Sequence, residues 1–198
     1  AQADLDKALP ALDDAVRVLS KLKKADIDEL KSIRTPGRGV VITMQAACLL
    51  FGVPPKLVKE DTGTGARKTV KDYFEPAKLQ LLSKANGFIE DMRNYDKDGI
   101  GDDMIKQLEP FVNDTENFSP EAVERSNKAA SGVCKWVHAM YLYATIAKEV
   151  EPKRQKLAAA QRDYDGAQER LKSALDRLHA VEAKLADLTA QFDAAEAK

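Results

Sequence analysis

The chain has 198 residues, of which 32% are charged, 44% hydrophobic and 6% aromatic. It is too apolar for a disordered chain and too charged for a membrane protein, and no apolar run approaches the roughly 18 residues of a membrane-spanning helix. The 31 basic and 32 acidic side chains nearly cancel, which argues against a nucleic-acid partner. Cys48 and Cys134 lie within apolar helical patterns. With no signal-peptide pattern at the start, they are predicted to be buried, reduced thiols of a cytosolic protein.

The first 35 residues carry a heptad pattern. Apolar residues recur at alternating steps of four and three, at Leu5, Leu9, Leu12, Val16 and Leu19, as in the seam of a coiled coil. Lys23 and Asp26 fill the next two seam positions, where they either weaken the helix register or mark the point at which the coil frays. Pro10 is predicted to kink this helix, and Pro36 to end it at Thr35.

The middle of the chain is predicted to form several short helices. Val40–Phe51 is apolar enough to be a central core helix, closed by Gly52. Residues 53–68 are predicted to be an exposed loop, and Pro76 to divide the helical stretch 70–92. Two further helices are expected over 102–108 and 120–128. No alternation of period two is found, so no sheet is predicted.

The last third repeats apolar residues every seven positions, at Leu157, Tyr164, Leu171, Leu178, Leu185 and Phe192. This strict register predicts a long coiled-coil helix that begins near Val133 and passes through Pro152. The simplest partner for this segment is the first heptad segment, which gives an antiparallel hairpin within one chain. Pairing of each segment with a second chain is the alternative.

Three apparent chemical motifs are incomplete. In the phosphate-loop-like stretch 63–69, Arg67 occupies the position of a required glycine. A calcium loop starting at Asn94 would place Ile105 where a bidentate glutamate is needed. Cys134 and His138 are one helical turn apart, but without the paired spacing of a zinc site. The sequence therefore predicts no catalytic site, metal or cofactor.

Several stretches resemble the stalk and microtubule-binding domain of dynein heavy chains. The resemblance rests on ALPAL (8–12), KSIRTPGRGVVITMQAACLLFG (31–52) and, most specifically, CKWVHAMYLYATIAKEVEPKR (134–154). DYFEPAKLQLL (72–82) and YDKDGI (95–100) are more similar to axonemal than to cytoplasmic dyneins.

This resemblance implies an all-α fold, with a small helical bundle at the tip of an antiparallel intramolecular coiled coil. Residues 1–35 would form the first stalk helix, 36–150 the microtubule-binding domain with a basic insertion near 53–71, and 151–198 the second stalk helix. It implies a non-catalytic fragment whose partners are α/β-tubulin and the remainder of the heavy chain, including the ATPase ring. The expected location is the cytoskeleton of the cytoplasm and the axoneme of a cilium or flagellum.

Because tubulin is acidic, its binding face on this chain should be basic. The expected contacts are Arg34, Arg38, Val41, Gln45 and Lys106, together with Lys56, Lys59, Arg67 and Lys68 of the insertion. Residues 54–71 have 5 basic and 2 acidic side chains, whereas residues 86–124 have 3 basic and 11 acidic. Relatives often carry lysine in place of Val41, and cytoplasmic relatives carry adjacent lysines in place of Glu109 and Pro110.

Two alternatives stay open at this point. Both charged segments can be ordinary solvated surface, and the chain can be a structural scaffold that dimerises through its heptads. On the stalk interpretation, coupling to the ring depends on the helix register, for which the candidate residues are Pro10, Lys23, Asp26 and Pro152. A seam rich in alanine specifies one register poorly, so two registers can lie within a few kcal/mol of each other.

Overall fold

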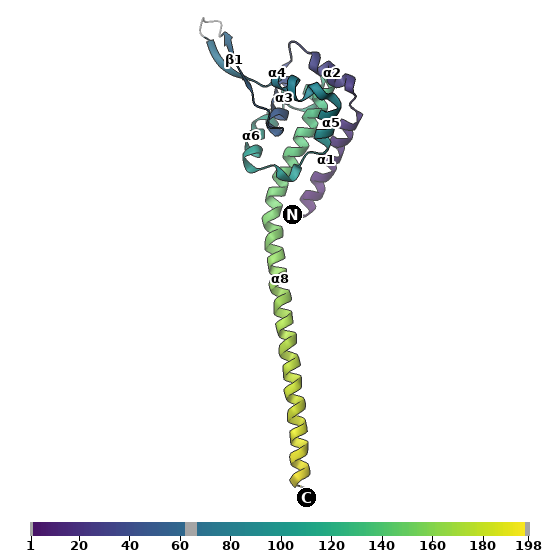
Figure 1. The fold of residues 1–198 in the computed structure, drawn as a ribbon, viewed down its shortest axis with the longest axis vertical. Coiled ribbons are helices and arrows are strands. Elements are labelled where there is room, and N and C mark those ends of the chain that lie inside the picture. Colours follow the sequence, from purple (N-terminus) through teal and green to yellow (C-terminus); the bar gives the residue numbers. More distant parts are fainter. Residues whose placement is uncertain (1, 62–66, 197–198) are drawn as a thin grey trace. The chain divides into compact units, whose positions relative to one another are not determined.

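A computed structural model describes residues 2–61 and 67–196, which form two compact units, one up to Val150 and one from Glu151. The elements, shown in Figure 1, are α1 (Gln2–Lys21), α2 (Lys24–Ser32), α3 (Arg38–Leu50), β1 (Lys56–Asp61), β2 (Arg67–Asp72), α4 (Phe74–Gln80), the 3₁₀ turn η1 (Leu82–Lys84), α5 (Ala85–Arg93), the 3₁₀ turn η2 (Lys97–Gly99), α6 (Asp102–Val112), α7 (Pro120–Glu124) and α8 (Lys128–Glu196). The predicted helical bundle is confirmed. None of the described helices is long and apolar enough to cross a membrane.

α1 lies antiparallel to the first part of α8. A methyl group added at Gly132 of α8 would lie 3.3 Å from Leu22 Cδ1, at the end of α1. Asp14 in α1, eight residues before Leu22, forms an ion pair with Lys135, three residues after Gly132 in α8. The hairpin is therefore present, but its partner segment is not the predicted one. α1 packs on residues 132–142, which precede the heptads that were expected to cover it.

The first heptad segment is broken at Leu22 and Lys23 and does not run unbroken to Thr35. Its buried side chains are Leu12, Ala15, Leu19 and Leu22 in α1, and Ile27 and Leu30 in α2. A continuous helix would turn Leu22 and Ile27, five residues apart, about 140° away from each other. The break lets both side chains reach the core. The prediction that Lys23 lies in the seam is wrong, because Leu22 is buried and Lys23 is exposed.

The prediction of no sheet is wrong, because β1 and β2 form a two-stranded antiparallel ribbon, here called the ribbon. Its register places Lys56 opposite Asp72 and Asp61 opposite Arg67. Figure 1 shows the ribbon leaving the helices near α3 and α4. The side chains of β2 are exposed or only half-buried. Hydrophobic alternation marks a strand with one buried face, so a ribbon with no buried face does not produce it.

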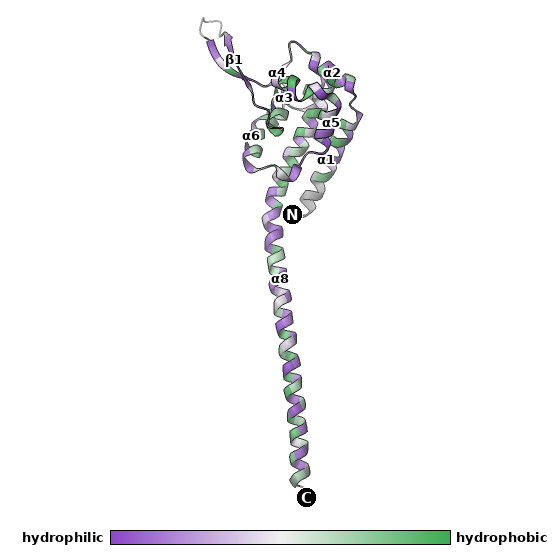
Figure 2. Cartoon of the chain, viewed as in Figure 1, coloured by the Kyte–Doolittle hydropathy of each residue, from purple (hydrophilic) through white to green (hydrophobic). Residues whose placement is uncertain are grey.

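The core is built around α3 and the first part of α8, and α3 confirms the predicted central helix. Trp136 of α8 is fully buried and donates from Nε1 to the Met92 carbonyl at 3.1 Å. Both cysteines are free and buried, as predicted. Burial raises the pKa of both the Cys48 and the Cys134 thiol to about 12, which keeps them protonated. Figure 2 shows hydrophobic residues concentrated on α3 and this part of α8, and hydrophilic ones on the ribbon.

Several helix ends differ from the predictions. Pro76 lies in the first turn of α4 and does not divide a longer helix, and residues 70–72 belong to β2. α6 continues past Leu108 to Val112 with Pro110 inside its last turn. α7 ends at Glu124, and α8 begins at Lys128, before Val133. This early start has a local cause, because the Asn127 side chain accepts the N–H of Ala130 at 2.9 Å and caps the helix.

The second unit consists of α8 from Glu151 onward, so the predicted long helix is confirmed there. Its heptad side chains are between 51% and 71% exposed, at Leu157, Tyr164, Leu171, Leu178, Leu185 and Phe192. Pro152 lies inside α8 and Pro10 inside α1, and neither ends its helix. The apolar heptad face is thus available to a partner helix.

Candidate partner-binding surface

One stripe of α3 faces outward. Val41, Gln45 and Leu49 are only half-buried and are spaced four residues apart, whereas most of the intervening positions are buried. Arg38 is exposed in the first turn, and Arg34 is exposed in the preceding loop. The sequence prediction of a stripe running through these residues agrees with their placement.

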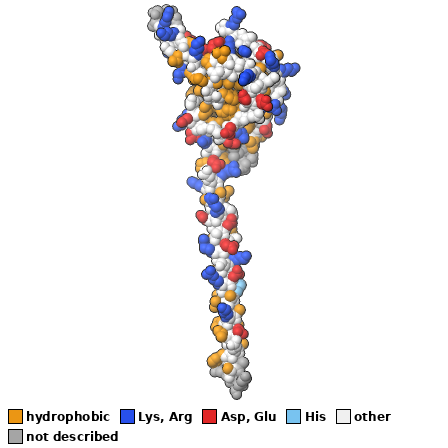
Figure 3. Space-filling model, in the orientation of Figure 1, with side chains coloured by type: hydrophobic (Ala, Val, Ile, Leu, Met, Phe, Trp, Pro, Cys, Tyr) orange, Lys and Arg blue, Asp and Glu red, His pale blue; other side chains and the backbone are white. Residues whose placement is uncertain are grey.

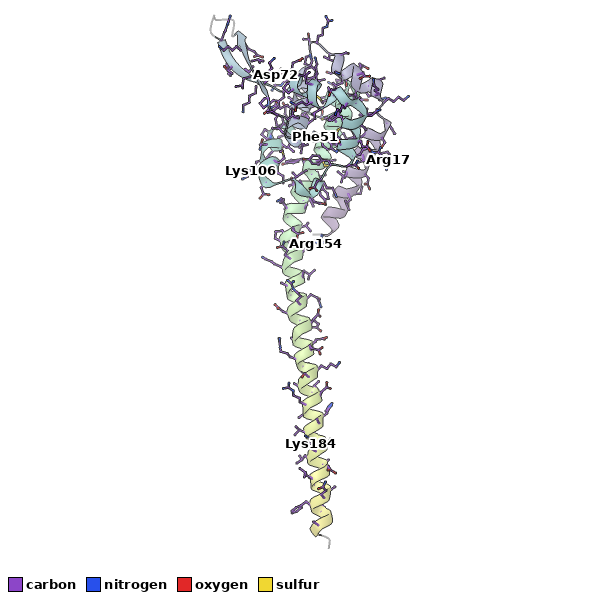
Figure 4. All side chains as sticks on the ribbon, in the orientation of Figure 1. Arg17, Phe51, Asp72, Lys106, Arg154 and Lys184 are labelled. Carbon is purple, nitrogen blue, oxygen red and sulfur yellow. The ribbon has the colours of Figure 1, made fainter. Side chains whose placement is uncertain are left out.

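The stripe borders a cleft of about 370 Å³ between α3 and the ribbon. The cleft is lined by Arg34, Pro36, Val41, Gln45, Val58, Glu60, Val70, Lys71, Asp72, Tyr73, Phe74 and Glu75. Figure 4 labels Asp72, at the base of the ribbon. The structure therefore brings three predicted residues of the α3 side together with the ribbon.

The acidic side chains of the cleft have partners within the domain. Asp72 accepts the backbone N–H of Phe74 at 2.9 Å and lies opposite Lys56 in the ribbon. Glu75 forms an ion pair with Lys78 at 3.1 Å. For Arg34, in contrast, the described part of the chain contains no ion pair. Arg34 is therefore an exposed cation at the edge of the cleft.

The two faces of the ribbon differ in charge, because side chains alternate between faces along each strand. The inner face, which carries Val58 and Val70 of the cleft, pairs Lys56 with Asp72 and Glu60 with Lys68. Among the side chains that the structure describes, the outer face carries Leu57, Lys59, Arg67, Thr69 and Lys71, of which Lys71 also borders the cleft. The inner face is balanced, and three of the described outer residues are basic. Figure 3 shows lysine and arginine side chains on the ribbon.

The remaining predicted residues lie outside the cleft lining. Arg38, Lys56, Lys59, Arg67 and Lys68 are exposed beside it or along the ribbon. Lys106 is exposed on α6, where Figure 4 labels it. Sequence reasoning missed Val58 and Val70 of the ribbon, and Tyr73–Glu75 at the start of α4. Two valines in strands without a buried face give too short a pattern to detect.

These features define a helical domain that presents an outward stripe and a basic ribbon, and that is continuous in sequence with a coiled-coil-type helix. A family model described as the microtubule-binding stalk of dynein motor matches residues 1–198. The chain belongs to this family.

Named relatives agree with the family assignment. The chain is 41% identical over 174 residues to mouse dynein axonemal heavy chain 1, which covers 88% of the chain and 4% of that protein. It is 37% identical over 155 residues to the dynein-1-beta heavy chain of the flagellar inner arm I1 complex of Chlamydomonas reinhardtii, covering 78% of the chain and 3% of that protein. This chain therefore spans only a small part of the length of these relatives.

A solved structure agrees with the family assignment as well. The microtubule-binding domain of dynein-c is 43% identical and matches with a TM-score of 0.62, over 79% of this chain and 97% of that one.

Proposed function

We propose that this chain is the microtubule-binding tip and part of the stalk of an axonemal dynein heavy chain, and that it binds tubulin without catalysing a reaction. The observation that carries the proposal is the outward stripe of α3, where Arg34, Arg38, Val41 and Gln45 share one exposed side. The family to which the chain belongs and the axonemal relatives of the chain support the same function. The location would then be the axoneme of a cilium or flagellum.

The charge distribution supports a shared role for α3 and the ribbon. Residues 86–124 have 11 acidic and 3 basic side chains, so they offer little attraction to an acidic filament. The five basic residues of the ribbon, at 56, 59, 67, 68 and 71, supply positive charge that this segment lacks. The ribbon is therefore proposed to add to the attraction that starts at Arg34 and Arg38.

The stalk role is proposed on the basis of the heptads. An exposed apolar face on the part of α8 from Leu157 to Phe192 fits a helix supplied by another stretch of the same heavy chain. A shift in the register of such paired helices would carry information between the tip and the ATPase ring of the motor.

The same exposed face also favours a second function, dimerisation as a coiled-coil scaffold. The two functions differ in oligomeric state. Analytical ultracentrifugation of the chain should give a monomer for a stalk hairpin, and a concentration-dependent dimer for a scaffold.

The proposed function is tested by co-sedimentation with microtubules over a range of salt concentrations. We expect the chain to pellet with microtubules, and its affinity to fall as salt is added, because exposed charges at the interface are screened. Equal pelleting with and without microtubules would exclude the function, and so would an affinity that rises with salt.

The contribution of the ribbon is tested by replacing Lys56, Lys59, Arg67 and Lys68 together with serine. Microtubule affinity should fall at least several-fold while the helical circular dichroism signal stays the same, because the exposed ribbon holds none of the core. The matched control replaces four exposed cations of α8, at 153, 154, 156 and 162, with glutamine. Equal affinity for the ribbon variant and the control would remove the ribbon from the interface.

A further inference from the structure

The connection between α2 and α3 carries an exposed threonine. Thr35 has no hydrogen bond to any other residue that the structure describes. The backbone is extended on either side of it, with φ −60° and ψ 124° at Ile33 and φ −65° and ψ 159° at Gly37. Pro36 also disfavours a helical backbone at the residue before it. An enzyme that modifies hydroxyl groups can therefore reach Thr35 on an extended stretch of chain.

The residues after Thr35 match the substrate pattern of one class of protein kinase. Pro36 follows Thr35 directly, and Arg38 comes three residues after it. Proline-directed kinases select the acceptor by the proline that follows it, which keeps the chain extended and removes a backbone N–H. Members of this class also recognise a cation three residues after the acceptor, as part of their charge selectivity. Thr35 has both determinants.

The sequence contains one other hydroxyl residue before a proline, and its surroundings differ. Ser119 is half-buried and accepts the N–H of Ala122 at 3.3 Å, which caps α7. The carbonyl of Pro120 accepts the hydroxyl of Ser131 at 2.8 Å, so this backbone is tied to α8. The residue three places after Ser119 is alanine and not a cation. The structure therefore favours Thr35 over Ser119 as an acceptor.

The charges around Thr35 are all positive. Residues 31–38 contain three basic side chains and no acidic one, and Arg34 lines the cleft beside the α3 stripe. A phosphothreonine carries about −1.5 to −2 charges at pH 7. It would cancel most of the positive charge of this stretch. Its oxygens would also offer the guanidinium groups of Arg34 and Arg38 a partner within the chain, in competition with the carboxylates of tubulin.

We propose that Thr35 is the acceptor of a proline-directed protein kinase, and that its phosphorylation weakens microtubule binding. The kinase transfers the γ-phosphoryl group of Mg-ATP to Thr35 Oγ1 of the unbound chain. The bond from the γ-phosphorus to the β-bridging oxygen breaks, the bond from phosphorus to Oγ1 forms, ADP leaves, and the hydroxyl proton passes to a base of the kinase. This inference rests on the proposed function, because the regulated site is the microtubule-binding one.

Treatment of the folded chain with a purified cyclin-dependent kinase and Mg-ATP tests the acceptor site. Mass spectrometry should place the phosphate on Thr35. Pro36→Ala should be modified at least about tenfold more slowly, whereas the control Ser119→Ala should be modified at the wild-type rate. An unmodified Thr35 in the wild-type chain, or equal rates for Pro36→Ala and wild type, would overturn the assignment of Thr35.

Co-sedimentation with microtubules tests the effect on binding. The phosphorylated chain should bind at least about fivefold more weakly than untreated chain, and the gap should narrow as salt is added, because screening weakens the charge effect. Its circular dichroism signal should stay the same, since negative charge ahead of the first turn of α3 favours a helix.

Kinase-treated Thr35→Val is the matched control for that binding test, because it keeps any phosphate attached elsewhere. Its affinity should equal that of untreated Thr35→Val. Equal affinities of the phosphorylated and untreated wild type, or a similar loss in treated Thr35→Val, would overturn the regulatory role. Untreated wild-type chain that fails to bind microtubules would instead overturn the proposed function, and the mass spectrum would still decide whether Thr35 is the acceptor.

Discussion

Tyr143 links α8 to the turn that precedes α6. Its hydroxyl donates to Asp98 Oδ1 at 2.6 Å, and Lys97 lies 5.2 Å from the centre of its ring. The hydrogen bond from Tyr143, followed by Lys97, holds the pKa of Asp98 below its usual value. This contact and the ion pair of Lys148 with Asp102 fasten α8 to the first turn of α6.

Replacing Tyr143 with phenylalanine should lower the unfolding free energy by about 0.5–1 kcal/mol at pH 7, a value reduced for the exposure of Asp98. Because the folded pKa of Asp98 is lowered, its contribution is present above the ordinary pKa of about 3.9 and is lost as the pH falls through the folded value. Urea unfolding at pH 7 and pH 3 measures both effects.

The control for this change is Tyr141→Phe, which removes a hydroxyl from the same helix without breaking a hydrogen bond among the described residues. The difference between the Tyr143 and Tyr141 variants should be smaller at pH 3 than at pH 7. A difference of the same size at both pH values would mean that the ionised Asp98 is not the source of the stabilisation.

At the scale of elements, Gly39 fixes how closely α3 packs against the loop before α7. A methyl group at this position would lie 2.8 Å from the Asn117 carbonyl oxygen and 3.2 Å from Val123 Cγ2. The first of these atoms belongs to the backbone and cannot rotate away. Gly39 also stands between Arg38 and Val41, so the packing of this turn positions the outward stripe.

Gly39→Ala should therefore destabilise the domain by about 1–3 kcal/mol, the usual range for overpacking. Gly87→Ala in α5 is the control, because its new methyl group would lie no closer than 3.5 Å to another side chain. The control should instead stabilise by about 0.5–1 kcal/mol through helix propensity. Denaturation of both variants measures this contrast, and equal effects would contradict the close packing at Gly39.

The elements that could be predicted are those with a long apolar pattern, such as the core helix α3 and the heptad part of α8. α3 follows from its apolar run and the glycine after it, and Gly52 indeed has a positive φ of 67°. The ribbon could not be predicted, because its faces are not buried. The break at Leu22 was hidden as well, because Leu12 and Leu19 fit both the continuous heptad and the observed seam.

Of the cleft and the stripe beside it, only the α3 stripe could be predicted from the sequence. The spacing of Arg38, Val41 and Gln45 places them on one face of any helix. The cleft depends on where the ribbon leaves the body, and Tyr73 and Phe74, buried at the start of α4, line it there. Such contacts between distant segments leave no periodic signal in a sequence.

At the scale of the whole molecule, the proposed transmission through the stalk depends on how α1 lies on the first part of α8. Gly132 of α8 lies against Leu22 at the end of α1, and Leu12 and Leu19 of α1 are buried as well, so a shift of α1 along α8 has to move these side chains. The ion pair of Asp14 with Lys135 is the specific contact that marks the observed register. The carboxylate is held mainly by this lysine, whose hydrogen bond lowers the pKa of Asp14.

We expect the register of α1 on α8 to control microtubule affinity, and disulfides can lock it. Asp14→Cys with Lys135→Cys fixes the observed register, and Asp14→Cys with Ser131→Cys or Ala139→Cys fixes one shifted by about half a heptad in either direction. Both native cysteines are first replaced with alanine. The observed-register lock and at least one shifted lock should differ several-fold in affinity, which corresponds to about 1 kcal/mol or more of coupling. Adding reductant should remove the difference, since the pairs then separate. Folded, oxidised locks that all bind equally would show that this part of the stalk is a rigid spacer.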